Sequence, residues 1–233
     1  MNRPVSPDRS AQYESLKIRL PLEITEITAQ KKNPERVSLF HNGEFLFGIH
    51  QHTCLECSIT KGSHLTRDLL TKVEALEGYH AVKNKAYDYL SRRDHATGEL
   101  SAKLSKKGFS TEMIELVKEE LSAKGYLNDQ VFSEKYAEEK IVLNRWGRRK
   151  IEAELLKKGV AIHHIRNGLD TAFSGQQESE ICLELIRKRK THFLKEENPA
   201  KRKNKIFNYL SGKGFSTAPI SGAIHQFEQE IDV

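Results

Sequence analysis

A pattern centred on a glycine occurs three times in this chain of 233 residues. In each copy an apolar pair lies eight and four residues before the glycine, an apolar residue follows the glycine directly, and an isoleucine comes five residues after that. A glycine in this place is typical of a helix that ends in the left-handed conformation. The chain is therefore predicted to repeat one helical unit, with neighbouring units burying each other's apolar faces. The glycines are Gly108, Gly159 and Gly214, and the pairs are Leu100 and Leu104, Ile151 and Leu155, and Ile206 and Leu210.

Each copy of the pattern follows another helical stretch, in which apolar residues recur three and four positions apart. We therefore predict units of three helices over residues 79–126, 127–173 and 174–233. The predicted fold class is mainly α, with tandem three-helix repeats in an elongated array after a small β-rich N-terminal unit.

The residues before the repeats have a different composition. Residues 1–20 are polar and without period, which predicts a flexible tail. A small unit of β-hairpin and helix is expected over 21–78, because two segments rich in β-branched and aromatic residues are joined by Asn42-Gly43, a strong hairpin signal. Its helix is predicted over about residues 66–76, and Gly78 is the expected boundary to the first repeat.

Composition and motifs exclude several classes of protein. A mean hydropathy of -0.61 and the lack of a long apolar run argue against a membrane span, and the polar start lacks a secretory signal, so we expect a cytoplasmic protein. The motifs typical of nucleotide hydrolysis, acyl transfer and zinc proteolysis are missing, so we expect no catalysis and no cofactor. Cys54 and Cys57 form a CxxC near two histidines, but a lone CxxC without a second Cys/His pair is a weak metal signal. The local sequence also fits one turn of helix with a cysteine facing a core, and no metal site is predicted.

The positive charge lies in the later part of the chain. Residues 1–78 hold 10 Lys plus Arg and 10 Asp plus Glu, whereas residues 79–233 hold 28 and 22, which accounts for the net charge of +6. Residues 187–205 alone carry nine cations and two anions. Such a density suits a polyanion, although a solvated basic loop would look the same. The candidate binding residues of this segment are Arg187, Lys188, Arg189, Lys190, Lys201, Arg202, Lys203 and Lys205.

A second basic cluster surrounds the only tryptophan of the chain. Cations at the start of a helix are unfavourable to the helix dipole, so Arg145, Arg148, Arg149 and Lys150 suggest a bound polyanion or acidic partner. Trp146 either fills a joint between two helices or contacts the partner. No matching cluster occurs in the first repeat, at Gly98-Glu99, which favours a binding role for the cations.

Three stretches of the repeats resemble the RecX family, the regulators of the bacterial RecA recombinase. They are "YDYLSRRDHATGELSAKLSKKGF", "KGYLNDQVFSEKYAEEKI" and "NRWGRRKIEAELLKKGV". The family motif falls on Trp146, Gly147, Arg148, Arg149, Ile151 and Leu155, and Arg148 stands where members commonly have a small residue or proline.

The resemblance implies a modulator without enzymatic activity. Family members are built from tandem three-helix units, bind in the groove of the RecA filament on single-stranded DNA, and typically inhibit its activities in DNA repair, homologous recombination and the SOS response. We accordingly expect a monomer that contacts the RecA filament and, weakly and without sequence preference, single-stranded DNA. The main alternative is a free-standing DNA-binding protein of the helix-turn-helix kind, since three-helix units with basic edges also describe that class. A metal-dependent nuclease is a more distant alternative.

Overall fold

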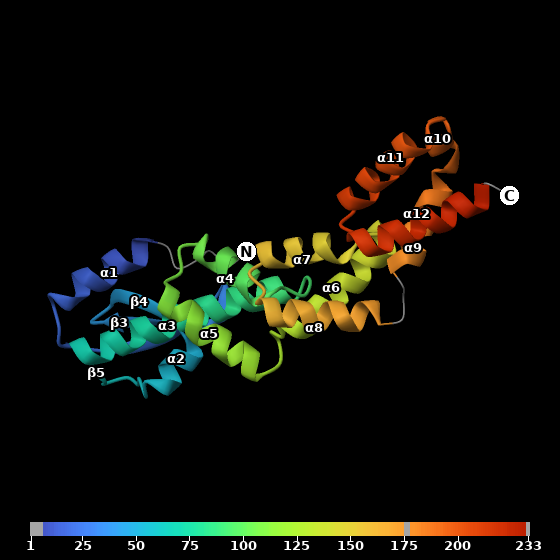
Figure 1. Ribbon diagram of the computed structural model, residues 1–233. Coiled ribbons are helices and arrows are strands. Elements are labelled where there is room, and N and C mark those ends of the chain that lie inside the picture. Colours follow the sequence, from blue (N-terminus) through green and yellow to red (C-terminus); the bar gives the residue numbers. More distant parts are fainter. Residues whose placement is uncertain (1–6, 175–177, 232–233) are drawn as a thin grey trace. The chain divides into compact units, whose positions relative to one another are not determined.

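The computed structural model describes residues 7–174 and 178–231, which form two compact units. The first unit contains the described residues up to Arg92 together with Ser101–Leu121, and the second contains Arg93–Leu100 and the described residues from Ser122 onward. Twelve helices and five strands occur in these residues, so the prediction of a mainly helical chain after a small β-rich unit is confirmed (Figure 1).

The sheet of the first unit is built around the predicted hairpin. Strands β2 (Glu26–Gln30), β3 (Asn33–His41) and β4 (Glu44–His50) form an antiparallel sheet in that order. Asn42 and Gly43 take φ angles of 48° and 83°, the left-handed values that a tight hairpin turn needs, so the hairpin prediction is confirmed. The short strands β1 (Leu22–Glu23) and β5 (His64–Leu65) pair with each other.

Helices α1 (Pro7–Lys17), α2 (Gln51–Glu56) and α3 (Arg67–Leu90) complete this part of the first unit. The prediction of a flexible tail over residues 1–20 is wrong for α1, because Tyr13 and Leu16 are buried in the same core as the sheet. Tyr13 and Leu16 lie three positions apart, on one face of this polar helix.

Helix α3 also passes through the boundary predicted at Gly78. A Cβ added at Gly78 would meet only the Cε of Met113 at 3.8 Å, so no close packing requires glycine there. One glycine disfavours a helix by only about 1 kcal/mol, which a helix of 24 residues tolerates. The C-terminal half of α3 packs on α5 (Thr111–Ala123), where Lys83 of α3 forms an ion pair with Glu120 at 2.8 Å.

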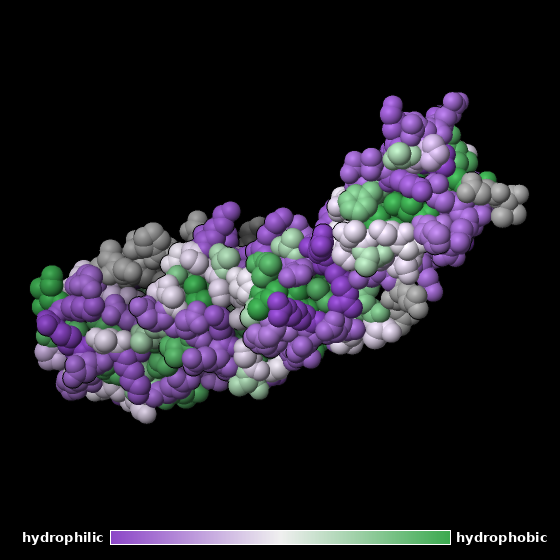
Figure 2. Space-filling model, viewed as in Figure 1, coloured by the Kyte–Doolittle hydropathy of each residue, from purple (hydrophilic) through white to green (hydrophobic). Residues whose placement is uncertain are grey.

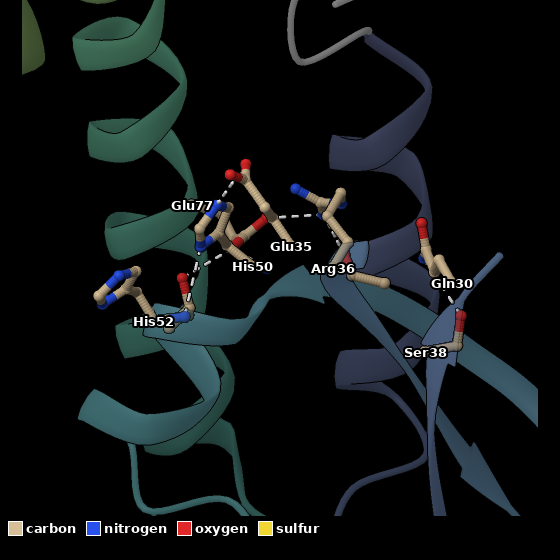
Figure 3. A network of polar contacts seen from close by, with 9 residues as sticks. Gln30, Glu35, Arg36, Ser38, His50, His52 and Glu77 are labelled. Atoms are coloured by element: carbon tan, nitrogen blue, oxygen red, sulfur yellow. Dashed lines mark hydrogen bonds and ion pairs between the residues drawn. The ribbon is translucent and has the colours of Figure 1, made fainter. Parts of the chain in front are cut away.

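A buried carboxylate connects the sheet to α3. Glu77 accepts hydrogen bonds from the backbone N–H of His50 and the hydroxyl of Thr53, both at 2.7 Å, and from the guanidinium of Arg36 at 2.8 Å (Figure 3). Burial alone would raise the pKa of Glu77, but these bonds and the Arg36 charge hold it below its ordinary value. The ionised side chain thus fixes the sheet on the helix.

The second and third repeats lie in the second unit. The second repeat contains α6 (Asp129–Asn144), α7 (Arg148–Lys157) and α8 (Ile162–Phe173), with α6 and α8 side by side (Figure 1). The third contains α9 (Glu178–Lys188), α11 (Pro199–Gly212) and α12 (Thr217–Ile231), and adds the short α10 (Lys190–Leu194). The first repeat consists of the end of α3, α4 (Thr97–Ser105) and α5, and the start of α4 belongs to the second unit.

The three pattern glycines end helices as predicted. Gly108, Gly159 and Gly214 have φ angles of 86°, 78° and 94°, which are left-handed. Behind the last two glycines, the N–H of Val160 donates to the carbonyl of Leu155 at 3.2 Å, and the equivalent bond of the third repeat is 3.3 Å long. The apolar pairs before all three glycines are completely buried.

Among the described residues, no helix has the length and apolar character needed to cross a bilayer.

Candidate anion-binding site

The second and third repeats meet through two glycine backbones, at a contact called here the second joint. The N–H of Gly147 donates to the carbonyl of Lys213 at 2.9 Å, and the N–H of Arg149 donates to the carbonyl of Gly214 at 3.0 Å. A Cβ on Gly147 would lie 2.6 Å from the carbonyl carbon of Gly214. Only glycine permits so close an approach.

The first joint, between the start of α4 and the second repeat, uses the same device. A Cβ on Gly98 would lie 2.7 Å from the Cα of Gly159. The glycine that ends the second helix of one repeat therefore receives a glycine from the repeat before it, at both joints.

The charges of the first joint compensate each other. Glu99 lies between Lys158, whose Nζ is 3.3 Å away, and Arg93, whose guanidinium donates at 3.2 Å. The Glu99 side chain is only 15% exposed. Burial would raise its pKa, but the two cations lower the pKa of Glu99 to about 2.

The second joint has a lysine in place of this glutamate. Glu99 directly precedes Leu100, the first residue of the apolar pair in the first repeat. Lys150 occupies the same position before the apolar pair of the second repeat. Lys158 and Lys213 likewise both precede their pattern glycines. Where the first joint pairs a glutamate with a lysine, the second therefore sets a lysine against a lysine.

Three cations gather at the second joint without a carboxylate partner. Lys150, Arg189 and Lys213 form no ion pair with any carboxylate in residues 7–174 and 178–231. Burial, and then the charges of Lys150 and Arg189, lower the pKa of Lys213. Its Nζ donates to the carbonyl of Asn144 at 3.1 Å.

Aromatic rings hold two of these cations. The Nζ of Lys150 lies 4.6 Å from the ring centre of Trp146, and the guanidinium carbon of Arg189 lies 4.6 Å from that of Tyr209. Trp146 also packs against the core of the second unit. The Trp146 ring therefore both packs at the second joint and orients the amine of Lys150.

Two of the predicted arginines near Trp146 are paired within the fold. Arg148 contacts Asp170 at 2.6 Å and Glu178 at 3.2 Å, and its guanidinium lies over the ring of Phe173. Arg145 takes a left-handed φ of 52° at the end of α6, and its guanidinium lies 3.5 Å from Glu184. Arg149 is exposed, and no carboxylate of the described part of the chain contacts its side chain.

The basic segment 187–205 divides in the same way. Arg202 was predicted to bind; its residue is only 9% exposed, and its guanidinium contacts Glu228 at 3.2 Å and 3.3 Å, so it is paired within the fold. Arg187 pairs with Glu230, and Lys203 lies 3.8 Å from Glu228. The visible face over α10 and α11 is largely hydrophilic (Figure 2). The exposed lysines of this segment include Lys188, Lys190, Lys201 and Lys205.

Sequence reasoning missed Lys213 and Tyr209 as members of the cluster. A lysine precedes every pattern glycine, so its position alone does not distinguish the second joint. The signal that could have found it is the residue opposite, which changes from Glu99 to Lys150.

The CxxC lies in the first unit, apart from these residues. The Sγ of Cys54 donates to the carbonyl of Ile59 at 3.3 Å, and burial raises the pKa of both thiols. The imidazoles of His50, His52 and His80 lie close together. Among the residues that the structure describes, no three His, Cys, Asp or Glu side chains are arranged to hold a metal ion.

Comparison with known proteins gives the same likeness along most of the chain. Residues 22–66 match the model of the regulatory protein RecX N-terminal domain. Residues 83–128, 128–169 and 176–224 match the first, second and third three-helix domains of RecX.

Individual relatives extend this likeness. "Regulatory protein RecX" of Clostridioides difficile (strain 630) is 30% identical over 192 residues, which cover 82% of this chain and 89% of that protein. A crystal structure of regulatory protein RecX superposes with a TM-score of 0.73 at 20% identity, covering 85% of this chain and 97% of the other. The crystal structure of RecX from Lactobacillus salivarius gives a TM-score of 0.61 at 21% identity, covering 66% of this chain and 99% of the other.

Proposed function

The chain belongs to the RecX family of regulatory proteins, and from this premise we propose that it regulates the RecA recombinase. In this proposal the protein is an inhibitor that binds in the groove of the RecA filament on single-stranded DNA. It thereby modulates DNA repair, homologous recombination and the SOS response, as a monomer and without catalysis of its own. The observation that carries the proposal is the family likeness over the N-terminal unit and all three repeats.

The contact surface is proposed to lie on the second and third repeats. The cations there that are exposed or half-buried, and that form no ion pair with a carboxylate in the described residues, can reach a partner without breaking the fold. Weak, sequence-indifferent binding to the single strand would follow from phosphate contacts of this kind. The residues proposed for this surface are Arg149, Lys150, Lys188, Arg189, Lys190, Lys201 and Lys205.

A titration of RecA tests the proposal. Purified protein is added to RecA with single-stranded DNA, and both ATP hydrolysis and strand exchange are measured. Both activities should fall at amounts near or below one protein per RecA. If neither activity responds at any ratio, the proposed function is wrong.

A set of charge variants tests the proposed surface. Replacing Arg149, Lys188 and Lys190 with Ala should raise the amount needed for inhibition by about tenfold, because interface cations set the association rate. The matched control replaces Lys61, Lys106 and Lys107, three exposed lysines of the first unit. Equal weakening by both triple variants would show that only total charge matters.

Gel shifts without RecA address the helix-turn-helix alternative. Tight, sequence-selective binding to duplex DNA would favour a free-standing DNA-binding protein. Salt-sensitive binding that ignores sequence fits the regulator.

A further inference from the structure

The change from Glu99 at the first joint to Lys150 at the second does not help to hold the repeats together. The backbone contact is the same at both joints, and Glu99 shows that this position accepts a carboxylate facing the lysine of the next repeat. At the second joint Lys150 faces Lys213, and their like charges oppose the docking of the repeats. The charge of Lys150 also acts on Glu154, but that carboxylate accepts its hydrogen bond from Lys157. An anion from outside the chain would remove the repulsion.

The cations are already ordered for such an anion. The amine of Lys150 rests on Trp146, the guanidinium of Arg189 rests on Tyr209, and the amine of Lys213 is bonded to the carbonyl of Asn144. Long basic side chains lose rotamer freedom when a ligand fixes them, and part of that loss has already occurred here because the three groups are held in place.

The three cations come from three separate elements. Lys150 lies in the first turn of α7, Arg189 at the turn between α9 and α10, and Lys213 just after α11. A chain of phosphates can place successive charges against donors that come from several elements, as proteins that bind single strands require.

We propose that the second joint is a composite phosphate-binding site for single-stranded nucleic acid, formed by Lys150 of the second repeat with Arg189 and Lys213 of the third. The proposal rests on the strand contact of the proposed function, narrows its location to the second joint and adds two residues, Lys213 and Tyr209. Because the cations belong to two repeats, a bound strand also stabilises the docking of those repeats, and docking in turn strengthens binding.

The test uses Lys150→Glu, which restores the charge pattern of the first joint. Binding of a labelled single-stranded oligothymidylate to the full chain, without RecA, is followed by fluorescence anisotropy over a range of salt concentrations. The variant should bind at least about tenfold more weakly. Its salt dependence should fall by about 1 to 2 in the slope of log K against log salt, since each lost phosphate contact removes about 0.7. Lys106→Glu, an exposed site of the first unit with the same charge change, is the matched control and should have a small effect.

Trp146 provides a second readout, because it is the only tryptophan in the chain. Its emission should change when unlabelled oligothymidylate binds, since a phosphate that pairs with Lys150 draws the amine away from the indole. The Lys150→Glu chain must first show a cooperative unfolding transition, and Lys150→Gln replaces it if that transition is lost.

Several results would overturn the inference. One is equal weakening by Lys150→Glu and Lys106→Glu, which would indicate general electrostatics. Another is an unchanged Trp146 emission on a strand-saturated protein. A third is displacement of the strand by polyglutamate at equal concentration of negative charge, which would indicate a carboxylate-rich protein partner.

The inference and the proposed function can fail separately. A protein that leaves RecA unaffected, yet loses oligothymidylate binding through Lys150→Glu, retains the site and loses the function. A protein that inhibits RecA while both glutamate variants bind the strand equally retains the function and loses the site.

Discussion

The first and second joints share a backbone contact and differ in charge. At both, a glycine of one repeat packs on the glycine that ends a helix of the next. At the first, Glu99 neutralises Lys158, whereas at the second Lys150 faces Lys213. The comparison teaches that the repeat pattern specifies docking, while the residue next to it is free to serve either stability or binding.

Opening the joints should have the largest effect. Gly147→Ala and Gly98→Ala each place a Cβ within 3 Å of facing backbone atoms, which cannot rotate away. We expect each substitution to lower the free energy of unfolding by about 2 to 3 kcal/mol, the cost of overpacking a tight contact. Denaturant unfolding measures this loss. Hydrogen exchange at the amides of Gly147 and Arg149, which bond across the second joint, locates it for Gly147→Ala.

A glycine in open space supplies the control. A Cβ on Gly222, in α12, would meet nothing within 4 Å, so Gly222→Ala should raise stability by about 0.5 to 1 kcal/mol. If Gly147→Ala unfolds at the same denaturant concentration as the unaltered chain, the close approach at the second joint is wrong.

Removing the compensating charge of the first joint should come next. Glu99→Gln leaves a neutral side chain between Arg93, which is half exposed, and Lys158, which is mostly buried. We expect a loss of about 2 kcal/mol, since a cation that loses its buried partner remains desolvated. Glu119 is exposed and no cation contacts it in the described ranges, so Glu119→Gln should change stability by less than about 0.5 kcal/mol. A similar loss in both variants would remove the special role of the first joint.

The same carboxylate predicts an acid-dependent loss of stability. The pKa of Glu99 is about 2 in the folded chain and 4.5 without the fold. A lowered folded pKa contributes stability that is complete above the unfolded pKa and is lost as the pH falls from about 5 towards 2. The difference in unfolding free energy between the unaltered chain and Glu99→Gln should therefore shrink across this range, by up to about 2 kcal/mol. A difference that stays constant from pH 7 to pH 3 would contradict the pairing.

Local signals predicted the repeats because each repeat carries its own helix end and buried pair. The helix ends at Gly108, Gly159 and Gly214 could be predicted from the preference of glycine for the left-handed conformation alone. The hairpin turn at Asn42-Gly43 follows from the same preference. The helix at Pro7–Lys17 escaped notice because its burial depends on the sheet, through Tyr13.

The candidate site was predictable only in part, for a similar reason. The excess of cations is visible in the composition of the later residues, but which of them are neutralised depends on partners distant in the chain. Arg202 meets Glu228 and Arg148 meets Asp170, whereas Lys213 meets Lys150 across a joint between repeats. Such pairings follow from the docking of repeats and not from any local period.

The smallest predicted effect has the opposite sign and joins stability to binding. Lys150→Glu turns the repulsion with Lys213 into an attraction, so the variant should be more stable than the unaltered chain by about 0.5 to 1 kcal/mol, the range of a partly exposed ion pair. Thermal unfolding at low and high salt measures this gain, which should diminish as salt screens the pair. Lys106→Glu, the control at an exposed site of the first unit, should give no such salt-dependent gain. A destabilised Lys150→Glu would mean that the two amines do not face each other. A Lys150→Glu variant that is more stable but no longer binds a single strand would show that Lys150 serves ligand binding and lowers the stability of the fold.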